Sequence, residues 1–201
     1  MVKVRVVADS ISEESISEEQ VRLITIEAEY PRIIHSELMT HRMFSRNSAS
    51  SRAIPFNKMC EQLGGMPTKF GRNHAGMQDN GVHVEEVQHI ELTHNGRATI
   101  SHLSPEQAWV KALESSVYHS KAFSDAGYHK QVFNRLTEPF QMIKTVISAT
   151  EWSNFFWLTD DDAADPTMKE LAVKIKEAVA KSSPKLLSSS QWHLPYVHTE
   201  D

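Results

Sequence analysis

Two N-terminal segments alternate apolar with polar or charged side chains, and this pattern most constrains the fold. Residues 2–7 alternate apolar and basic side chains. Within residues 21–30, the apolar residues at positions 24, 26 and 28 alternate with the polar or acidic residues at positions 25, 27 and 29. A period of two is typical of a half-buried β-strand. Pro31 ends the second segment and suits the first turn of a helix, so we expect a helix over residues 32–43. Two strands followed by a helix favour a small sheet that packs against helices.

The middle of the chain carries a set of signals for element boundaries. Ser104 is a preferred N-cap residue, Pro105 suits the first helical position, and Gly127 suits the residue after a helix end. Before them, the Asn95-Gly96 pair between two apolar segments is typical of a hairpin turn. The sequence therefore predicts a hairpin within residues 83–102 and a long helix after it.

Weaker patterns suggest the remaining elements. They are a polar loop or short helix over 10–19, a polar loop over 45–53, a short helix over 55–63, an irregular segment over 64–80, a helix over 129–137, a strand or buried helix over 140–149, an acidic turn over 160–165, a helix over 168–180, and a polar tail from residue 182 anchored by residues 192–196. No internal repeat or linker divides the chain. We expect one α+β domain over residues 1–201, with a small antiparallel or mixed sheet packed with helices and with residues 83–102 as a hairpin insertion.

Composition narrows the class of protein. Hydrophobic residues make up 40% of the 201 residues and charged residues 23%, as in globular proteins. The apolar runs are far shorter than the roughly 20 residues that span a membrane, and no signal peptide opens the sequence. The net charge of −5 argues against a general nucleic-acid coat. We expect a soluble intracellular protein.

Metal binding is not expected from the sequence. Cys60 is the only cysteine, which excludes a disulfide framework and a cysteine-rich zinc site. Pairs such as His83 and His89, or His94 and His102, could be imagined as ligands, but none shows the His-Glu-x-x-His spacing.

Residues 41–52 are the segment most suggestive of chemistry. They combine one histidine, three arginines and four serines. Arginine offers a planar fork of donors that suits phosphate, and serine hydroxyls with backbone N–H groups complete such a cradle. Three or four charge-assisted hydrogen bonds of about 1.5–3 kcal/mol each would bind a nucleotide phosphate at micromolar strength. The same composition also suits a solvated surface loop with incidental arginines.

This segment resembles the signature of the flavin-dependent thymidylate synthases, in particular their short, phage-type members. The signature reads Arg-His-Arg, seven residues, then Ser; here Thr40-His41-Arg42 precede Ser50 by seven residues. Further residues in register with the two motif segments of the family are Ser45, Asn47 and Arg52, then Arg135 with Pro139, and Ser148 with Asn154-Phe155-Phe156.

The resemblance implies a specific activity and assembly. Members of this family are homotetramers that hold FAD at subunit interfaces and methylate dUMP at C5, using methylenetetrahydrofolate and NADPH. By position, the FAD contacts would be His41, Arg42, Asn47, Ser48, Ser148 and Asn154. The contacts to the pyrimidine deoxynucleotide would be Glu37, Thr40, Ser48, Ser50, Ser51, Arg52 and Arg135. The resemblance also implies a cytoplasmic enzyme (in the host cytoplasm if a phage encodes it) with no metal, membrane or nucleic-acid partner.

The sequence departs from the family at four positions. Glu37, Thr40 and Ser48 replace the usual glutamine, arginine and glutamate, and Thr159 replaces the arginine that helps to ionise the uracil. An arginine there stabilises negative charge on the pyrimidine, and threonine cannot, so we assign no catalytic residue.

Three acidic residues that follow Thr159 leave alternatives open. Asp160, Asp161 and Asp162 suit a solvated turn that caps the next helix. Alternatively, a carboxylate such as that of Asp160 faces the base and accepts from the amino group of cytosine. The alternatives to dUMP methylation are therefore a flavin-dependent methylase or hydroxymethylase that acts on dCMP or dUMP for modified phage DNA, and a non-catalytic nucleotide-binding homologue.

Overall fold

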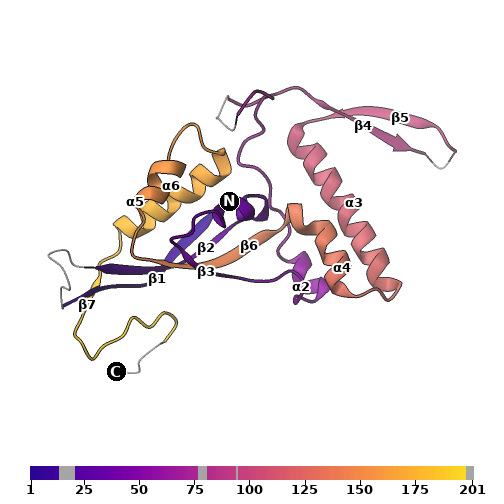
Figure 1. The fold of residues 1–201 in the computed structure, drawn as a ribbon. Helices are drawn as coiled ribbons and strands as arrows, with labels where there is room; N and C mark the ends of the chain where they lie inside the picture. Colours follow the sequence, from indigo (N-terminus) through magenta and orange to yellow (C-terminus); the bar gives the residue numbers. More distant parts are fainter. Residues whose placement is uncertain (14–20, 77–80, 94, 198–201) are drawn as a thin grey trace.

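The computed structural model describes residues 1–13, 21–76, 81–93 and 95–197. Its centre is a mixed five-stranded sheet with the strand order β3-β6-β2-β1-β7 (Figure 1). The strands are β1 (Lys3–Ser12), β2 (Arg22–Pro31), β3 (Ser45–Ser48), β6 (Met142–Ala149) and β7 (Lys185–Leu187). β7 pairs in parallel with β1, and the other neighbours are antiparallel. The expected α+β class and the small mixed sheet are confirmed.

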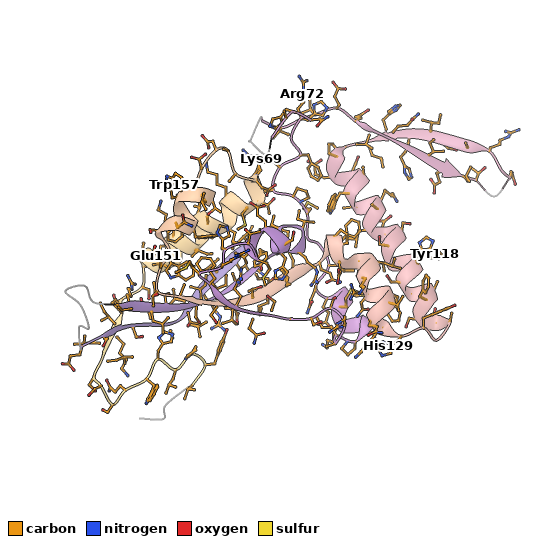
Figure 2. The ribbon with its side chains drawn as sticks, viewed as in Figure 1. Lys69, Arg72, Tyr118, His129, Glu151 and Trp157 are labelled. Carbon is orange, nitrogen blue, oxygen red and sulfur yellow. The ribbon has the colours of Figure 1, made fainter. Side chains whose placement is uncertain are left out.

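One face of this sheet forms the hydrophobic core. It is covered by α5 (Ser153–Thr159) and α6 (Pro166–Ala180). Ile26 of β2 and the α6 residues Leu171 and Ile175 are fully buried in one cluster, whereas Trp157 on α5 points outward (Figure 2). Because burying such an aliphatic side chain contributes about 1.5–3 kcal/mol, this cluster holds the sheet and the two helices together.

The opposite face, which we call the polar face, carries Thr25, Glu27 and Glu29 of β2. Arg5 on β1 donates from Nε and Nη2 to the two carboxylate oxygens of Glu27, at 3.1 and 3.0 Å. Tyr196 in the C-terminal segment donates to the same carboxylate at 2.9 Å. The hydrogen bonds from Arg5, assisted by that from Tyr196, hold the pKa of Glu27 down to about 2. The C-terminal segment is therefore attached to the polar face by the hydrogen bond from Tyr196 to the Glu27 carboxylate.

The remaining elements form a second part of the molecule beside the sheet (Figure 1). They are α2 (Phe56–Cys60), the hairpin of β4 (Val87–Leu92) and β5 (Ala98–Leu103), α3 (Pro105–Asp125), α4 (Lys130–Phe133) and the 3-10 helix η2 (Asn134–Phe140). Ser104 and Gln107 form a capping box at the start of α3. Trp109 of α3 donates to the carbonyl of Gly65 at 2.9 Å and packs its ring on Phe140. The predicted hairpin and long helix are confirmed.

The expected helix over residues 32–43 is wrong in its extent. The chain forms a 3-10 turn, η1 (Arg32–Ile34), and then a single helical turn, α1 (His35–Leu38). The hydroxyl of Thr40 donates to the carbonyl of Glu37 at 2.7 Å, which satisfies a carbonyl at the helix end. Phe44 is only 5% exposed, and its burial in the core turns the chain away from the helix axis. Glu37 therefore lies within α1, whereas His41 lies beyond its end.

The expected polar loop over residues 45–53 is also wrong in part, because Ser45–Ser48 is β3. This strand pairs with β6 at the edge of the sheet, with Ser45 opposite Ser148 and Ser48 opposite Thr145. An edge strand needs only backbone hydrogen bonds on one side and does not need an alternating apolar pattern. Side chains such as serine and asparagine therefore gave no local signal for it.

Three further segments, over residues 140–149, 129–137 and 10–12, take structures that their sequence patterns left open or indicated wrongly. Most of the segment 140–149 forms the strand β6 rather than a buried helix. The expected helix over 129–137 is instead the short α4 followed by η2, which continues through Pro139 to Phe140. Residues 10–12 belong to β1 rather than to a polar loop or short helix. The rest of that expected segment lies outside the described residues, apart from Glu13. Within the described ranges, no helix combines the length and the apolar character that crossing a membrane requires.

Candidate functional site

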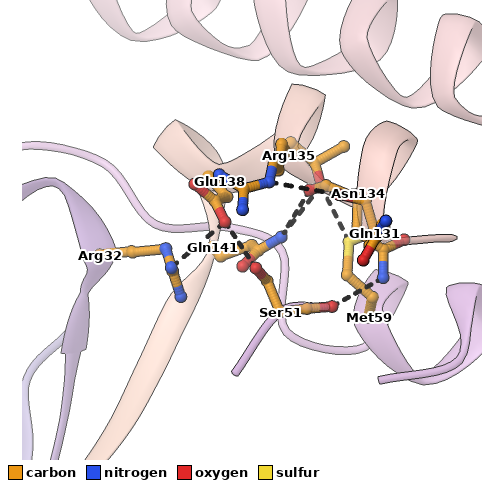
Figure 3. Close-up of polar contacts among 9 residues, drawn as sticks. Arg32, Ser51, Met59, Gln131, Asn134, Arg135, Glu138 and Gln141 are labelled. Carbon is orange, nitrogen blue, oxygen red and sulfur yellow. Dashed lines mark hydrogen bonds and ion pairs between the residues drawn. The ribbon is translucent and has the colours of Figure 1, made fainter. Parts of the chain in front are cut away.

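Two distant segments of the chain are joined by buried hydrogen bonds around Ser51 (Figure 3). The buried amide of Asn134 donates from Nδ2 to the carbonyls of Ser51 and Ile54, at 2.8 and 2.9 Å. The hydroxyl of Ser51 donates to Glu138 at 2.5 Å, and the same Glu138 oxygen accepts from Arg32 at 3.2 Å. We call Arg32, Ser51, Asn134 and Glu138 the Ser51 junction. It fixes the loop after β3 against η2.

The Ser51 junction brings two of the predicted nucleotide contacts to one place. Arg52 follows Ser51 directly, Arg135 follows Asn134, and both arginine side chains are exposed. The only hydrogen bond of the Arg135 side chain within the described residues goes to the backbone carbonyl of Gln131. Lys130 donates to the carbonyl of Ala53 at 2.9 Å. No described carboxylate pairs with these three cations, so the loop offers unneutralised positive charge of the kind that binds phosphate.

A cavity of about 540 Å³ lies beside the Ser51 junction. Its volume falls within the range of small-molecule sites. Apolar side chains such as Ile54 and Met142 line part of it. Its charged lining residues are the basic Lys3, Arg32, Lys58 and Lys144 and the acidic Glu29 and Glu61. Each of the four basic side chains is paired with a described carboxylate, so the lining of the cavity is polar and close to neutral, with apolar patches. Ser51 is the one predicted nucleotide contact among the lining residues that the structure describes.

Two predicted nucleotide contacts lie elsewhere. Glu37 and Thr40 line a second cavity of about 540 Å³, together with Asp165. Burial raises the pKa of Glu37, and the nearby Asp165 carboxylate raises it further. This second cavity shares no lining residue with the cavity at the Ser51 junction. In one chain, Glu37 and Thr40 therefore lie apart from Ser51.

The predicted flavin contacts on the sheet come together through the register of β3 and β6. Asn47 lies opposite Val146, two residues from Ser148, so Asn47 and Ser148 share the polar face. Ser48 belongs to the core face, where its hydroxyl lies 2.8 Å from that of Thr145. The hydroxyl of Ser48 is thus engaged within the fold, whereas the Asn47 side chain is exposed.

The other predicted flavin contacts are Asn154 on α5, and His41 and Arg42 in the segment that contacts it. The ring of His41 meets Phe155 edge-on, with 4.9 Å between the ring centroids. Burial lowers the pKa of His41, and the Arg46 guanidinium adds to this effect, so both favour the neutral ring. Asn154, next to Phe155, and Arg42 are both exposed. These donors suit the polar and anionic groups of a flavin dinucleotide.

Thr159 and Asp160 are oriented by the fold itself. Thr159 is 3% exposed, and its hydroxyl donates to the carbonyl of Phe155 within α5. The carboxylate of Asp160 accepts from Lys176 of α6 at 2.8 Å. In this chain the hydroxyl of Thr159 is therefore turned into the protein, and the carboxylate of Asp160 is paired.

Several residues of the candidate site were not found from the sequence. Asn134 and Glu138 flank Arg135, and only this proximity could have suggested them. His193 contacts the polar face; the residues 192–196 around it predicted an anchored tail but not a contact of the histidine itself. In the part of the chain that the structure describes, no three His, Cys, Asp or Glu side chains come together as metal ligands. His94 lies outside the described residues.

Two of the solved structures with a similar fold are of the same methylase. The UMP/dUMP methylase PolB from Streptomyces cacaoi, bound with 5-Br dUMP, matches with a TM-score of 0.60 at 12% sequence identity, over 90% of this chain and 90% of that chain. The same methylase bound with 5-Br UMP matches with a TM-score of 0.57 at 13% identity, over 90% and 89%. At these identities the likeness concerns the fold. No protein-family model matches the sequence, and no curated protein matches it.

Proposed function

We propose that this chain is a flavin-dependent C5-methyltransferase of the thymidylate synthase type, which converts dUMP into dTMP with methylenetetrahydrofolate and NADPH. The observation that carries the proposal is the Ser51 junction, since it joins the loop of Arg52 to the segment of Arg135, and neither guanidinium has a described acidic partner. The fold of a UMP/dUMP methylase supports the same substrate class.

In the proposed reaction, this chain binds and orients the substrate. Arg52, Arg135 and Lys130 neutralise the phosphate of the nucleotide. Asn134 and Glu138 hold the loop that carries Arg52, so that less motion is lost on binding. The cavity beside Ser51 offers apolar contacts for the base or for the one-carbon donor. FAD, when bound, supplies the redox chemistry.

The positions of the flavin residues favour a site between subunits. Asn47 and Ser148 lie on the polar face, whereas His41 and Asn154 lie beside α5, on the side of the sheet that α5 and α6 cover. One isoalloxazine ring would not contact both groups within one chain. We therefore propose a homotetramer in the cytoplasm, in which each FAD contacts residues of more than one subunit.

Turnover with defined substrates tests the proposed function. The purified protein is mixed with FAD, NADPH and methylenetetrahydrofolate, and with either dUMP or dCMP, and mass spectrometry identifies the products. We expect dTMP from dUMP and no product when FAD is omitted. A methylated or hydroxymethylated product from dCMP would reassign the substrate. Binding of dUMP without any product would instead identify a non-catalytic nucleotide-binding protein.

A further inference from the structure

His193 connects the C-terminal segment to the polar face through both nitrogens of its ring. Nδ1 lies 2.6 Å from the hydroxyl of Ser10 on β1, and Nε2 lies 2.8 Å from the hydroxyl of Thr25 on β2. The Thr25 hydroxyl also lies 2.6 Å from that of Ser148 on β6. Four side chains therefore form one hydrogen-bonded chain, which ends at a predicted flavin contact.

A shift in the pairing of β1 with β2 explains why the Ser10 side chain lies on the polar face. The register of β1 against β2 shifts between Val6 and Ala8. Such a β-bulge reverses the alternation of faces, so Ser10 lies on the polar face with Thr25 although Arg5 lies there too. Ser10 is 6% exposed and Thr25 is fully buried. Among the described residues, the Ser10 side chain contacts His193, and the Thr25 side chain contacts His193 and Ser148.

The position of the proton on the His193 ring determines whether the Ser148 hydroxyl can donate a hydrogen bond outward. If Nε2 carries the proton, it donates to Thr25, Thr25 donates to Ser148, and the proton of Ser148 is free to point outward. If Nδ1 carries the proton instead, Thr25 donates to Nε2, Ser148 donates to Thr25, and Ser148 offers only lone pairs. A hydroxyl has one proton to donate, so these two arrangements exclude each other.

We propose that His193 is a positioning residue for the cofactor, which orients the hydroxyl of Ser148 through Thr25. The inference rests on the proposed function, because it assigns the outward side of Ser148 to a polar atom of FAD. Ser148 is half-buried, so one side of its hydroxyl remains open to such a contact.

The surroundings of His193 allow its role to be separated from the attachment of the tail. Tyr196 binds Glu27, and β7 pairs with β1, independently of the histidine. Burial lowers the pKa of His193, and the nearby Asp9 carboxylate opposes this effect. Asp9 is itself paired with Arg22 at 2.6 Å. A substitution at His193 should therefore alter the hydrogen-bonded chain and leave the segment in place.

Two pairs of matched variants test the proposal. The amide of glutamine reaches the position of Nε2, whereas the shorter asparagine reaches only that of Nδ1. His193→Gln therefore keeps the contact with Thr25, and His193→Asn loses it. Thr25→Val removes the hydroxyl that links His193 to Ser148, and Thr25→Ser restores it. FAD affinity is measured by quenching of flavin fluorescence, together with the absorption spectrum of the bound flavin and the unfolding temperature of each variant.

We expect His193→Asn and Thr25→Val to bind FAD about fivefold more weakly, as for the loss of one hydrogen bond, and to shift the flavin absorption band. His193→Gln and Thr25→Ser should stay within about twofold of the unsubstituted protein. Equal FAD affinity and equal spectra for all four variants would overturn the role of His193. If the unsubstituted protein itself binds no FAD, the proposed function fails, and the inference fails with it.

Discussion

At the scale of single residues, Asn134 shows how one buried amide organises exposed charges. It donates to the carbonyls of Ser51 and Ile54 and so holds the loop that carries Arg52. Its Oδ1 is buried and has no hydrogen-bond partner among the described residues. An unpaired buried acceptor costs about 1–3 kcal/mol, which the two donated bonds offset. The exposed Arg52 and Arg135 each adjoin a residue of this contact, and neither is paired with a described acid.

Arg52 gives a direct test of phosphate binding. Because Arg52→Ala removes a charged donor worth about 1.5–3 kcal/mol, dUMP should bind about 10- to 100-fold more weakly. Titration calorimetry measures the dissociation constant. Arg97→Ala is the control, since Arg97 is also exposed but lies on the hairpin. Unchanged dUMP affinity in Arg52→Ala would remove the phosphate role from this residue.

Glu27 couples the stability of the polar face to pH. Its pKa in the folded protein is about 2, below the ordinary value of 4.5, so its stabilising effect is present above pH 4.5 and disappears as the pH falls toward 2. Glu27→Gln should lower the free energy of unfolding by about 1–2 kcal/mol at pH 7. The difference in the free energy of unfolding between Glu27→Gln and the unsubstituted protein should therefore decrease as the pH falls from 4.5 toward 2.

Urea unfolding at a series of pH values measures this effect. Glu29→Gln is the matched control, because Glu29 lies on the same strand and contacts the exposed Lys3 through a single ion pair. Glu29→Gln should lower the free energy of unfolding by less than about 0.5 kcal/mol. A constant difference between Glu27→Gln and the unsubstituted protein from pH 7 to pH 2 would contradict the assigned pKa.

At the scale of elements, η2 is the connection between the sheet and the α3 part of the molecule. The amides of Gly64 and Gly65 both donate to the carbonyl of Phe140, at 2.9 and 2.8 Å. The amide of Arg32 donates to the carbonyl of Gln141 at 2.8 Å. The end of η2 is therefore held from two sides, and the backbone passes close to Gly65. Only a residue without a side chain fits there.

Gly65→Ala should disrupt this connection. A Cβ at position 65 would lie 2.5 Å from the carbonyl oxygen of Gln141, and the obstacle is backbone. We expect a loss of about 1–3 kcal/mol in the free energy of unfolding, measured with urea. Gly71→Ala is the control, because its Cβ would meet nothing closer than 3.6 Å. Equal stability of the two variants would show that the Gly65 region adjusts freely.

At the scale of the whole molecule, the hairpin and α3 leave much apolar surface uncovered. Ile90, Leu92 and Ile100 of the hairpin are 57%, 75% and 57% exposed, and Tyr118 of α3 points away from the rest of the protein (Figure 2). A two-stranded hairpin is marginal in water by itself, and extended apolar surface is typical of interfaces. This surface is consistent with the proposed homotetramer.

A single charge on the hairpin tests that assembly. Ile100 lies directly opposite Ile90, and Ile100→Lys should reduce the molecular mass in solution, as measured by size-exclusion chromatography with light scattering. Thr99→Lys is the control, since Thr99 is also exposed but lies on the other side of the strand. The same mass for Ile100→Lys and the unsubstituted protein would exclude this face of the hairpin from the interface.

Local signals were sufficient where neighbours in sequence decide the structure. The alternation of residues 21–30, the cap at Ser104 and the Asn95-Gly96 turn all predicted the observed elements. The resemblance of residues 40–52 to a known signature similarly indicated Arg52 as a phosphate contact, which stays a prediction. Capping and alternation act over a few residues, so a single sequence reveals them.

Tertiary structure alone decided what depends on distant partners. β3 exists because β6 pairs with it, and the helix after Pro31 ends early because Phe44 is buried in the core. Asn134 reaches Ser51 across more than eighty residues, and His193 reaches Thr25 across more than a hundred and sixty. The sequence thus determined which residues carry the charge and the hydroxyl groups. Long-range packing and pairing determined which of them meet, because those energies depend on contacts that no local pattern encodes.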